Sequence, residues 1–128
     1  MMSLDHTAIW VIDLEREKEF FMRYFDCVAG DRYCNPAKGF TSYFIAFPGG
    51  GRIEIMKREG MDPGRRSEAC GYAHIAVNAG SREDVDRLTR RLISEGVPVE
   101  SGPRITGDGY YESVILDPEN NLIEIVSE

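Results

Sequence analysis

The chain contains two histidines, and each begins a short run typical of a β-strand. His6 starts the run His-Thr-Ala-Ile-Trp-Val, and His74 starts the run His-Ile-Ala-Val. Two glutamates recur in a similar way, because Ile53-Glu54-Ile55 and Ile123-Glu124-Ile125 have the same letters. Neutral imidazole and carboxylate oxygen suit a borderline divalent ion such as zinc, nickel, cobalt or iron(II). These four side chains therefore predict a metal site.

Side chains alternate between the two faces of a β-strand, and this alternation predicts the sheet face on which the two histidines and the two glutamates lie. In each Ile-Glu-Ile run the two isoleucines face one way and the glutamate faces the other. If the isoleucines pack under helices, then Glu54 and Glu124 point to the opposite sheet face, and the alternation places His6 and His74 there as well. Two carboxylates brought close together without a cation would repel each other, and a metal removes that conflict.

The elements around these residues indicate a tandem duplication. Asp13 is a candidate N-cap for a helix in the first half, and Ser81, with Asp84 three residues later, is one for the second half. Apolar residues recur at three- and four-residue steps in both segments, which predicts one buried stripe for each helix. The stripe residues are Phe20, Phe21, Tyr24, Phe25 and Val28 in the first half, and Val85, Leu88, Leu92 and Ile93 in the second, where Gly96 follows as a left-handed end.

A hairpin follows each predicted helix. The first has strands at Thr41–Phe47 and Arg52–Met56 around a Pro-Gly-Gly-Gly turn, and the second has strands at Tyr110–Leu116 and Leu122–Val126 around Asp117–Asn121. The fold class is therefore α+β with tandem βαβββ modules. We expect one domain over 1–128, with module 1 at about 3–57, a linker at 58–69 and module 2 at about 70–127.

The composition and charge of the chain argue against several classes of function. The formal net charge of −7 argues against a nucleic-acid partner, because binding phosphates requires a basic face. No apolar run approaches the roughly 18 residues of a membrane span, and the N-terminus lacks the pattern of a secretion signal. Cys27, Cys34 and Cys70 show no C-x-x-C spacing. We expect a cytoplasmic protein with free thiols and no membrane partner.

The four candidate ligands are also where the sequence resembles the vicinal-oxygen-chelate superfamily (glyoxalase, bleomycin-resistance and dioxygenase proteins), and glyoxalase I in particular. That family has His or Gln on the first strand, Glu closing the first module, His opening the second and Glu closing it. His6, Glu54, His74 and Glu124 match these positions one by one, and the segment from Asp117 to Glu124 is similar to the family's closing turn and strand. The resemblance implies a cupped, partly open mixed sheet with the helices on its outer face.

The resemblance also implies a reaction and its cofactors. It predicts a lyase or isomerase that moves a proton between neighbouring carbons of a small α-hydroxy carbonyl or thiol-conjugate substrate, through a metal-bound enediolate. Glu124 or Glu54 would be the catalytic base, and the sequence leaves that choice open. The site would hold one divalent metal, zinc or nickel first, with cobalt, iron or manganese as alternatives. A thiol such as glutathione is a candidate co-substrate.

Substrate contacts are less sharply defined. Glyoxalase I enzymes that use glutathione often carry Arg four residues after the first ligand and Asn four residues after the first Glu, and here Trp10 and Arg58 stand there. Trp10 is a candidate substrate-binding residue with the core as its alternative, whereas Arg58 is expected on a solvated surface. Three further candidates lie in a glycine-containing segment that leads into the last hairpin: Arg104, Tyr110 and Tyr111.

Other functions share this fold. Extradiol dioxygenases and thiol transferases of the superfamily use three-ligand sets, so Glu54 as a fourth ligand favours the glyoxalase pattern, and a metal-free drug-binding protein of the bleomycin-resistance kind needs no ligands. Family members of this length form two-fold dimers with sites at the interface. We therefore expect a homodimer, in which His6 and Glu54 of one chain meet His74 and Glu124 of the other. The residues alone leave open whether each site is shared between chains.

Overall fold

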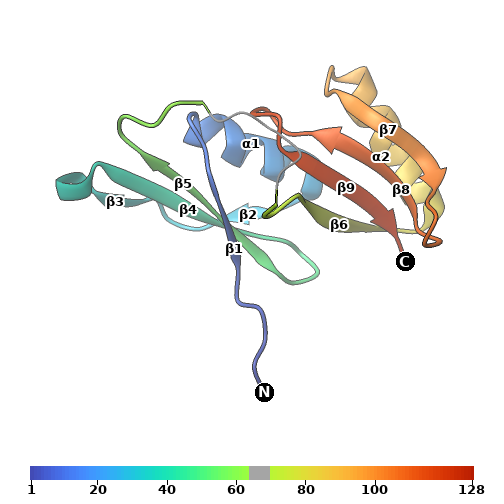
Figure 1. Cartoon of the computed structure of the whole chain (residues 1–128), viewed down its shortest axis with the longest axis horizontal. Helices are drawn as coiled ribbons and strands as arrows, with labels where there is room; N and C mark the ends of the chain where they lie inside the picture. Colours follow the sequence, from blue (N-terminus) through green and yellow to red (C-terminus); the bar gives the residue numbers. More distant parts are fainter. Residues whose placement is uncertain (64–69) are drawn as a thin grey trace. The chain divides into compact units, whose positions relative to one another are not determined.

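The computed structural model describes residues 1–63 and 70–128, and the chain divides into two compact units, Met1–Arg65 and Arg66–Glu128. Each unit has its own sheet and its own helix (Figure 1). Residues 64–69, which belong to the predicted linker, lie outside the described residues.

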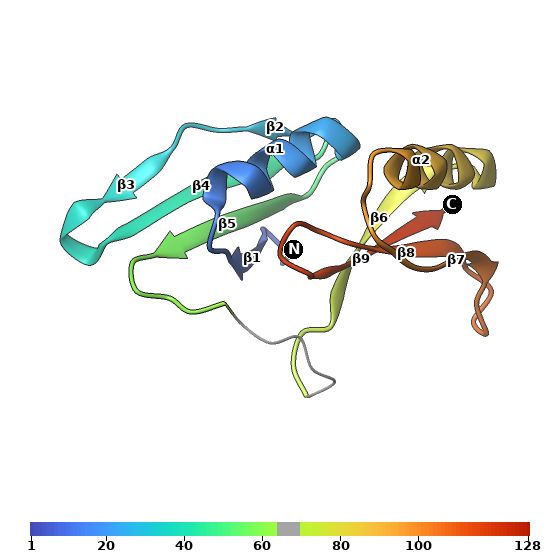
Figure 2. The ribbon, with the colours of Figure 1, turned by 90° about the horizontal axis from the view of Figure 1, so that it is seen from above.

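The first unit carries one helix on a mixed sheet. Its elements are β1 (Thr7–Trp10), α1 (Leu14–Phe25), β2 (Val28–Ala29), β3 (Tyr33–Asn35), a 3₁₀ turn (Pro36–Lys38), β4 (Phe40–Ala46) and β5 (Arg52–Arg58). The strand order is β1-β5-β4-β2, and β3 also pairs with β4. β1 runs parallel to β5, and the other pairs are antiparallel. α1 packs against β4 and β5, which is seen from above in Figure 2.

The second unit repeats this plan. Its elements are β6 (His74–Gly80), α2 (Arg82–Ser94), β7 (Val99–Ile105), β8 (Tyr111–Leu116) and β9 (Leu122–Ser127). The strand order is β6-β9-β8-β7, with β6 parallel to β9 and the other pairs antiparallel. The predicted α+β class with duplicated βαβββ modules is confirmed. In the first unit the strand after the helix is split into β2 and β3, which the sequence pattern did not predict.

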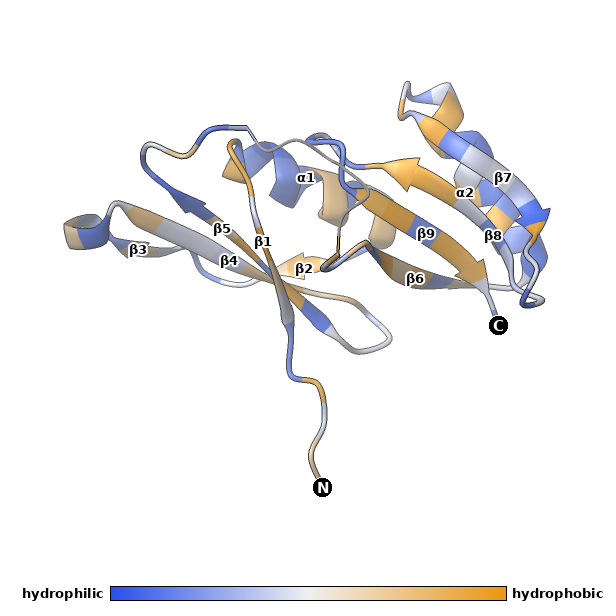
Figure 3. Ribbon diagram, in the orientation of Figure 1, coloured by the Kyte–Doolittle hydropathy of each residue, from blue (hydrophilic) through white to orange (hydrophobic). Residues whose placement is uncertain are grey.

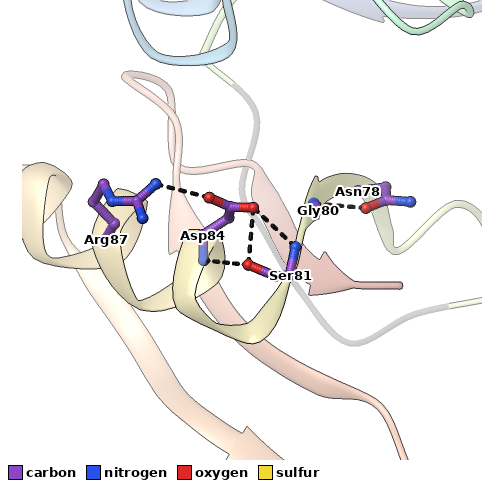
Figure 4. A network of polar contacts seen from close by, with 5 residues as sticks. All are labelled: Asn78, Gly80, Ser81, Asp84 and Arg87. Atoms are coloured by element: carbon purple, nitrogen blue, oxygen red, sulfur yellow. Dashed lines mark hydrogen bonds and ion pairs between the residues drawn. The ribbon is translucent and has the colours of Figure 1, made fainter.

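Both helices begin at the predicted caps. The Asp13 carboxylate accepts a hydrogen bond from the Arg16 backbone N–H at 3.0 Å, which satisfies one of the free N–H groups of the first turn. Ser81 and Asp84 form a full capping box: Asp84 N–H donates to the Ser81 hydroxyl at 3.1 Å, and Ser81 N–H donates to the Asp84 carboxylate at 2.9 Å (Figure 4). After α2, Gly96 has φ +84°, the predicted left-handed end.

Each core forms where the helix stripe meets the isoleucine face of the sheet. Figure 3 shows β9 as mostly hydrophobic with a hydrophilic interruption, as the Ile-Glu-Ile pattern predicts. The most deeply buried hydrophobic side chains are Val11, Phe21, Ile45 and Ile55 in the first unit, and Val85, Leu92, Ile115, Ile123 and Ile125 in the second. Two stripe predictions were wrong, because Val28 is 69% exposed in the short strand β2 and Ile93 is 57% exposed. Thr89 takes the buried place on α2 instead.

The hairpins form with altered bounds. β4 begins at Phe40, one residue early, and β5 continues to Arg58, inside the segment predicted as linker. The Asp117 carboxylate accepts hydrogen bonds from the backbone N–H groups of Glu119 and Asn121 at 2.9 and 2.8 Å and so holds the second turn. None of the helices in residues 1–63 and 70–128 is long and apolar enough to cross a membrane.

Candidate metal centre

The strand registers place each candidate glutamate on the sheet face away from its helix. Ala8 lies beside Glu54 in the first unit, and Ala76 lies beside Glu124 in the second. The neighbouring isoleucines of both strands are buried under the helices. The two units therefore present their Glu side chains in equivalent places, each next to an alanine that leaves space for a ligand.

In the first unit the sheet brings His6 to Glu54. His6 directly precedes β1, and its Nε2 lies 3.5 Å from Glu54 Oε1. On the other side of the ring, His6 Nδ1 lies 2.7 Å from Asp5 Oδ2. The hydrogen bond with His6 and the nearby Arg52 hold the pKa of the Asp5 carboxyl below its usual range. Asp5 was not among the site residues predicted from the sequence.

In the second unit β6 and β9 bring His74 to Glu124. The distance from His74 Nε2 to Glu124 Oε1 is 3.0 Å. The side chains are partly exposed, 39% for His74 and 23% for Glu124. Each unit thus contains one imidazole nitrogen facing one carboxylate oxygen, as the strand alternation predicted.

Each of the two distances fits a pair of ligands on one metal ion. Zinc lies about 2.0 to 2.2 Å from imidazole nitrogen and carboxylate oxygen. Two such ligands at bond angles of about 90° to 110° are therefore about 2.9 to 3.5 Å apart. The observed separations of 3.5 and 3.0 Å lie in that interval. Among the described residues no group of three His, Cys, Asp or Glu side chains is placed to hold a metal, so each unit offers a pair of ligands.

A second glutamate, Glu112, lies next to Glu124 and was missed by the sequence reasoning. Glu112 on β8 is paired with Val126, and Val114 is paired with Glu124, so the two carboxyls are diagonal neighbours on one face. Glu112 is only 7% exposed. Burial, followed by the charge of Glu124 and a hydrogen bond with it, raises the pKa of Glu112. The five-residue turn after Leu116 fixes this register, and the alternation along β8 could have revealed Glu112.

Trp10 and Arg58 lie on the same face as Glu54. Trp10 is paired with Met56, two residues from Glu54, and Arg58 continues that alternation at the end of β5. The Arg58 guanidinium lies 4.7 Å from the centre of the Trp10 ring. Trp10 is 42% exposed, so it is a surface residue of this face and not part of the core. Arg58 is the last residue of β5, where the sequence had suggested the first residue of a linker, and it is exposed, as predicted.

The three remaining substrate candidates are all in the second unit, and they lie in different surroundings. Arg104 lies within β7, directly opposite Glu112, and so belongs to the face of the candidate ligands. Tyr110 is 53% exposed in the turn before β8. Tyr111 hydrogen-bonds to Asp86 of α2 and lies under Arg82, whose guanidinium is 5.2 Å from its ring centre. This places Tyr111 among the groups that join α2 to the sheet.

The cysteines are free thiols, as predicted. Cys27 is buried, and burial raises its pKa to about 12. A thiol with such a pKa is protonated near neutral pH and is a poor nucleophile. Cys34 and Cys70 are exposed.

Comparison with known protein families gives the same classification. The sequence model of the glyoxalase/bleomycin resistance protein/dioxygenase superfamily matches residues 3–125. The chain therefore belongs to this superfamily, and the resemblance inferred from the four candidate ligands is confirmed at the level of the family.

Individual relatives are distant. The chain is 24% identical to YqjT of Bacillus subtilis, with 97% of this chain and 98% of YqjT covered. It is 28% identical to a lactoylglutathione lyase of Schizosaccharomyces pombe, with 98% of this chain and 47% of the lyase covered. The chain thus spans less than half of that lyase.

Solved structures show the same fold. The trypanothione-dependent glyoxalase I of Leishmania major matches with a TM-score of 0.83 at 22% identity, covering 100% of this chain and 88% of that one. The fosfomycin resistance protein FosX of Listeria monocytogenes, solved with Mn(II) and sulfate, matches with a TM-score of 0.74 at 22% identity, covering 100% and 93%. At these identities the likeness establishes the fold.

Proposed function

We propose that this protein is a metal-dependent enzyme of the glyoxalase I kind, in which His6, Glu54, His74 and Glu124 hold one divalent ion. The repeated pair carries the proposal: each unit has one imidazole nitrogen within 3.5 Å of a carboxylate oxygen. The two pairs lie in different units, and their meeting at one ion is part of the proposal. Zinc and nickel suit this mixture of nitrogen and oxygen ligands, with cobalt, iron or manganese as alternatives.

The proposed reaction is an isomerisation or lyase step on a small α-hydroxy carbonyl compound or its thiol conjugate. A bound divalent ion would act as a Lewis acid that stabilises negative charge on a substrate oxygen. Glu124 or Glu54 takes the proton from one substrate carbon and returns it to the neighbouring carbon. A glutamate has two carboxylate oxygens and a flexible stem, so it can hold the metal and still reach a substrate proton.

The proposed substrate differs from a glutathione conjugate. Arg58 and Trp10 stand where glutathione-using glyoxalases often carry Asn and Arg, and here they stack on each other 4.7 Å apart. A guanidinium stacked on an indole keeps its charge and N–H donors at the ring edge, where it can bind a carboxylate or phosphate. Arg104, opposite Glu112, is the candidate substrate contact of the second unit.

The proposed assembly is a homodimer with shared sites, in the cytoplasm. A two-fold dimer uses the same surface twice and covers open sheet edges in one step. The three free thiols fit a reducing compartment.

The test combines metals with substrates. Metal-stripped protein is reloaded with each of several divalent ions and assayed with methylglyoxal in the presence of different thiols. We expect metal-dependent turnover that Glu124→Gln abolishes, while Glu83→Gln, an equal change on α2 in the same unit, keeps full activity.

The rival functions have their own signatures in the same assay. Oxygen consumption with a catechol and iron(II) would indicate a dioxygenase, and loss of the thiol into a stable adduct would indicate a transferase. Tight drug binding without any metal would indicate a protein of the bleomycin-resistance kind. Each of these results without isomerisation contradicts the proposed reaction.

A further inference from the structure

Asp5 and His6 are adjacent in sequence, and their side chains are joined. Asp5 Oδ2 lies 2.7 Å from His6 Nδ1, and the same oxygen accepts a hydrogen bond from Arg52 Nη2 at 2.6 Å. A carboxylate has acceptors only, so the proton of this contact is carried by His6 Nδ1. A neutral His6 then has its lone pair on Nε2, the nitrogen that faces Glu54.

Arg52 is itself fixed in place. It begins β5, two residues before Glu54 and on the same sheet face. Its guanidinium lies 4.4 Å from the centre of the Phe44 ring. Phe44 in turn meets the His6 ring edge to face, with the centroids 4.9 Å apart and the planes at 83°. The imidazole is therefore held by the Asp5 carboxylate and by the Phe44 ring, and Arg52 contacts both.

A cation or a proton is needed between His6 Nε2 and the Glu54 carboxylate. With Nδ1–H directed to Asp5, a neutral His6 presents a lone pair to the lone pairs of a carboxylate 3.5 Å away. Two acceptors facing each other repel, and a metal ion between them turns both into ligands. A carboxylate on the far nitrogen also makes the imidazole a stronger ligand and fixes its orientation.

We propose that Asp5 is a positioning residue for the metal centre, which it serves by holding His6 in the Nδ1–H tautomer with Nε2 free to bind the ion, and that Arg52 holds Asp5 for this purpose. The proposal rests on the proposed metal site. The second half of the chain has Ala73 before His74, so this device distinguishes the first histidine from the second.

The tautomer is measured directly in metal-free protein. Long-range ¹⁵N–¹H spectra of histidine-labelled protein, taken above the titration of the rings, show which nitrogen of His6 carries the proton. We expect Nδ1–H in the wild type and loss of that preference in Asp5→Ala. A wild-type His6 protonated at Nε2 overturns the proposal, whatever the protein's affinity for metal.

Zinc affinity is then compared by competition with a chelator. We expect Asp5→Ala to bind zinc about 10- to 100-fold more weakly, the usual effect of removing such a partner. Asp5→Asn, which keeps an acceptor, should fall between Asp5→Ala and the wild type. Arg52→Met should show a smaller loss than Asp5→Ala. Asp31→Ala removes an exposed carboxylate from the same unit and should leave the affinity unchanged.

The outcomes separate this proposal from the proposed function. A wild type that binds no zinc contradicts the metal site itself and the role of Asp5 with it. A wild type that binds zinc, together with an Asp5→Ala variant of equal affinity, overturns only the role of Asp5. An equal loss in Asp31→Ala would mean that total charge is responsible, and would overturn it too.

Discussion

A buried pair of hydroxyls joins α2 to β8, and its two members should not contribute equally to stability. The Thr89 hydroxyl donates to the Val85 carbonyl at 2.7 Å, and its oxygen lies 2.8 Å from the Ser113 hydroxyl. The side chains are 1% and 0% exposed. A hydroxyl has one proton to donate, so Ser113 must be the donor to Thr89. Ser113 faces the helix, and its neighbour Glu112 therefore faces the candidate ligands.

The expected magnitudes follow from which group is left without a partner. Ser113→Ala removes one hydrogen bond and leaves Thr89 bonded to Val85, so we expect a loss of about 1 kcal/mol. Thr89→Val keeps the shape but leaves the buried Ser113 hydroxyl unsatisfied, for a loss of about 1 to 3 kcal/mol. The double variant has no such orphan, and its loss should be smaller than the sum of the two single losses by roughly 1 kcal/mol.

Urea unfolding measures these differences in the free energy of unfolding, as shifts of the midpoint urea concentration at an unchanged slope of free energy against urea. Amide hydrogen exchange of α2 and β8 assigns the change to the second unit. Ser94→Ala is the matched control, because the Ser94 hydroxyl bonds to the Arg91 carbonyl on an exposed surface and should change stability by less than about 0.5 kcal/mol. Equal effects of Ser113→Ala and Ser94→Ala, or strictly additive losses in the double variant, would refute the reasoning.

Three further expectations concern pH, specificity and assembly. Glu112 has a folded-state pKa above its ordinary 4.5, so the stability of metal-free protein falls as the pH rises from about 4.5 through that folded-state pKa. Glu112→Gln should therefore be more stable than the wild type at neutral pH in thermal melts, and this gain should vanish below about pH 4.5. Since Trp10 and Arg58 form a stacked pair, turnover of the glutathione hemithioacetal of methylglyoxal should be poor, and a kcat/KM near about 10⁸ M⁻¹s⁻¹ would contradict this. Mixing inactive His6→Ala and Glu124→Ala proteins should restore activity through one intact shared site, and inactivity after proven subunit exchange would mean that each site is built within one chain.

The sequence predicted those parts of the fold that depend on local periodicity. The caps at Asp13 and Ser81 and the opposite faces of Ile and Glu in β9 follow from spacing alone, and the structure has them. The end of β5 and the position of β7 were not predicted, because strand ends depend on pairing with distant segments. Ile93 is exposed although it was assigned to the stripe, because the buried stripe of α2 runs through Val85, Thr89 and Leu92.

The two His–Glu pairs of the candidate site were predictable from the sequence, but their surroundings were not. His6 and Glu54 stand out because they recur in the second half. Asp5 in the first half and Glu112 in the second have no counterpart of their kind in the other half. Their contacts with His6 and Glu124 arise only after a side chain turns back or strands pair. A repeat in the sequence therefore identifies the side chains that both halves share, whereas the neighbouring groups present in only one half are identified from the folded structure.

Calorimetric titration of metal-stripped protein with zinc tests the four-ligand site most directly. We predict roughly one ion per chain. We also predict that His6→Ala, in the first unit, and His74→Ala, in the second, each weaken this same binding event. No zinc binding, or two ions per chain of which each variant loses only its own, would contradict a single centre built from both pairs.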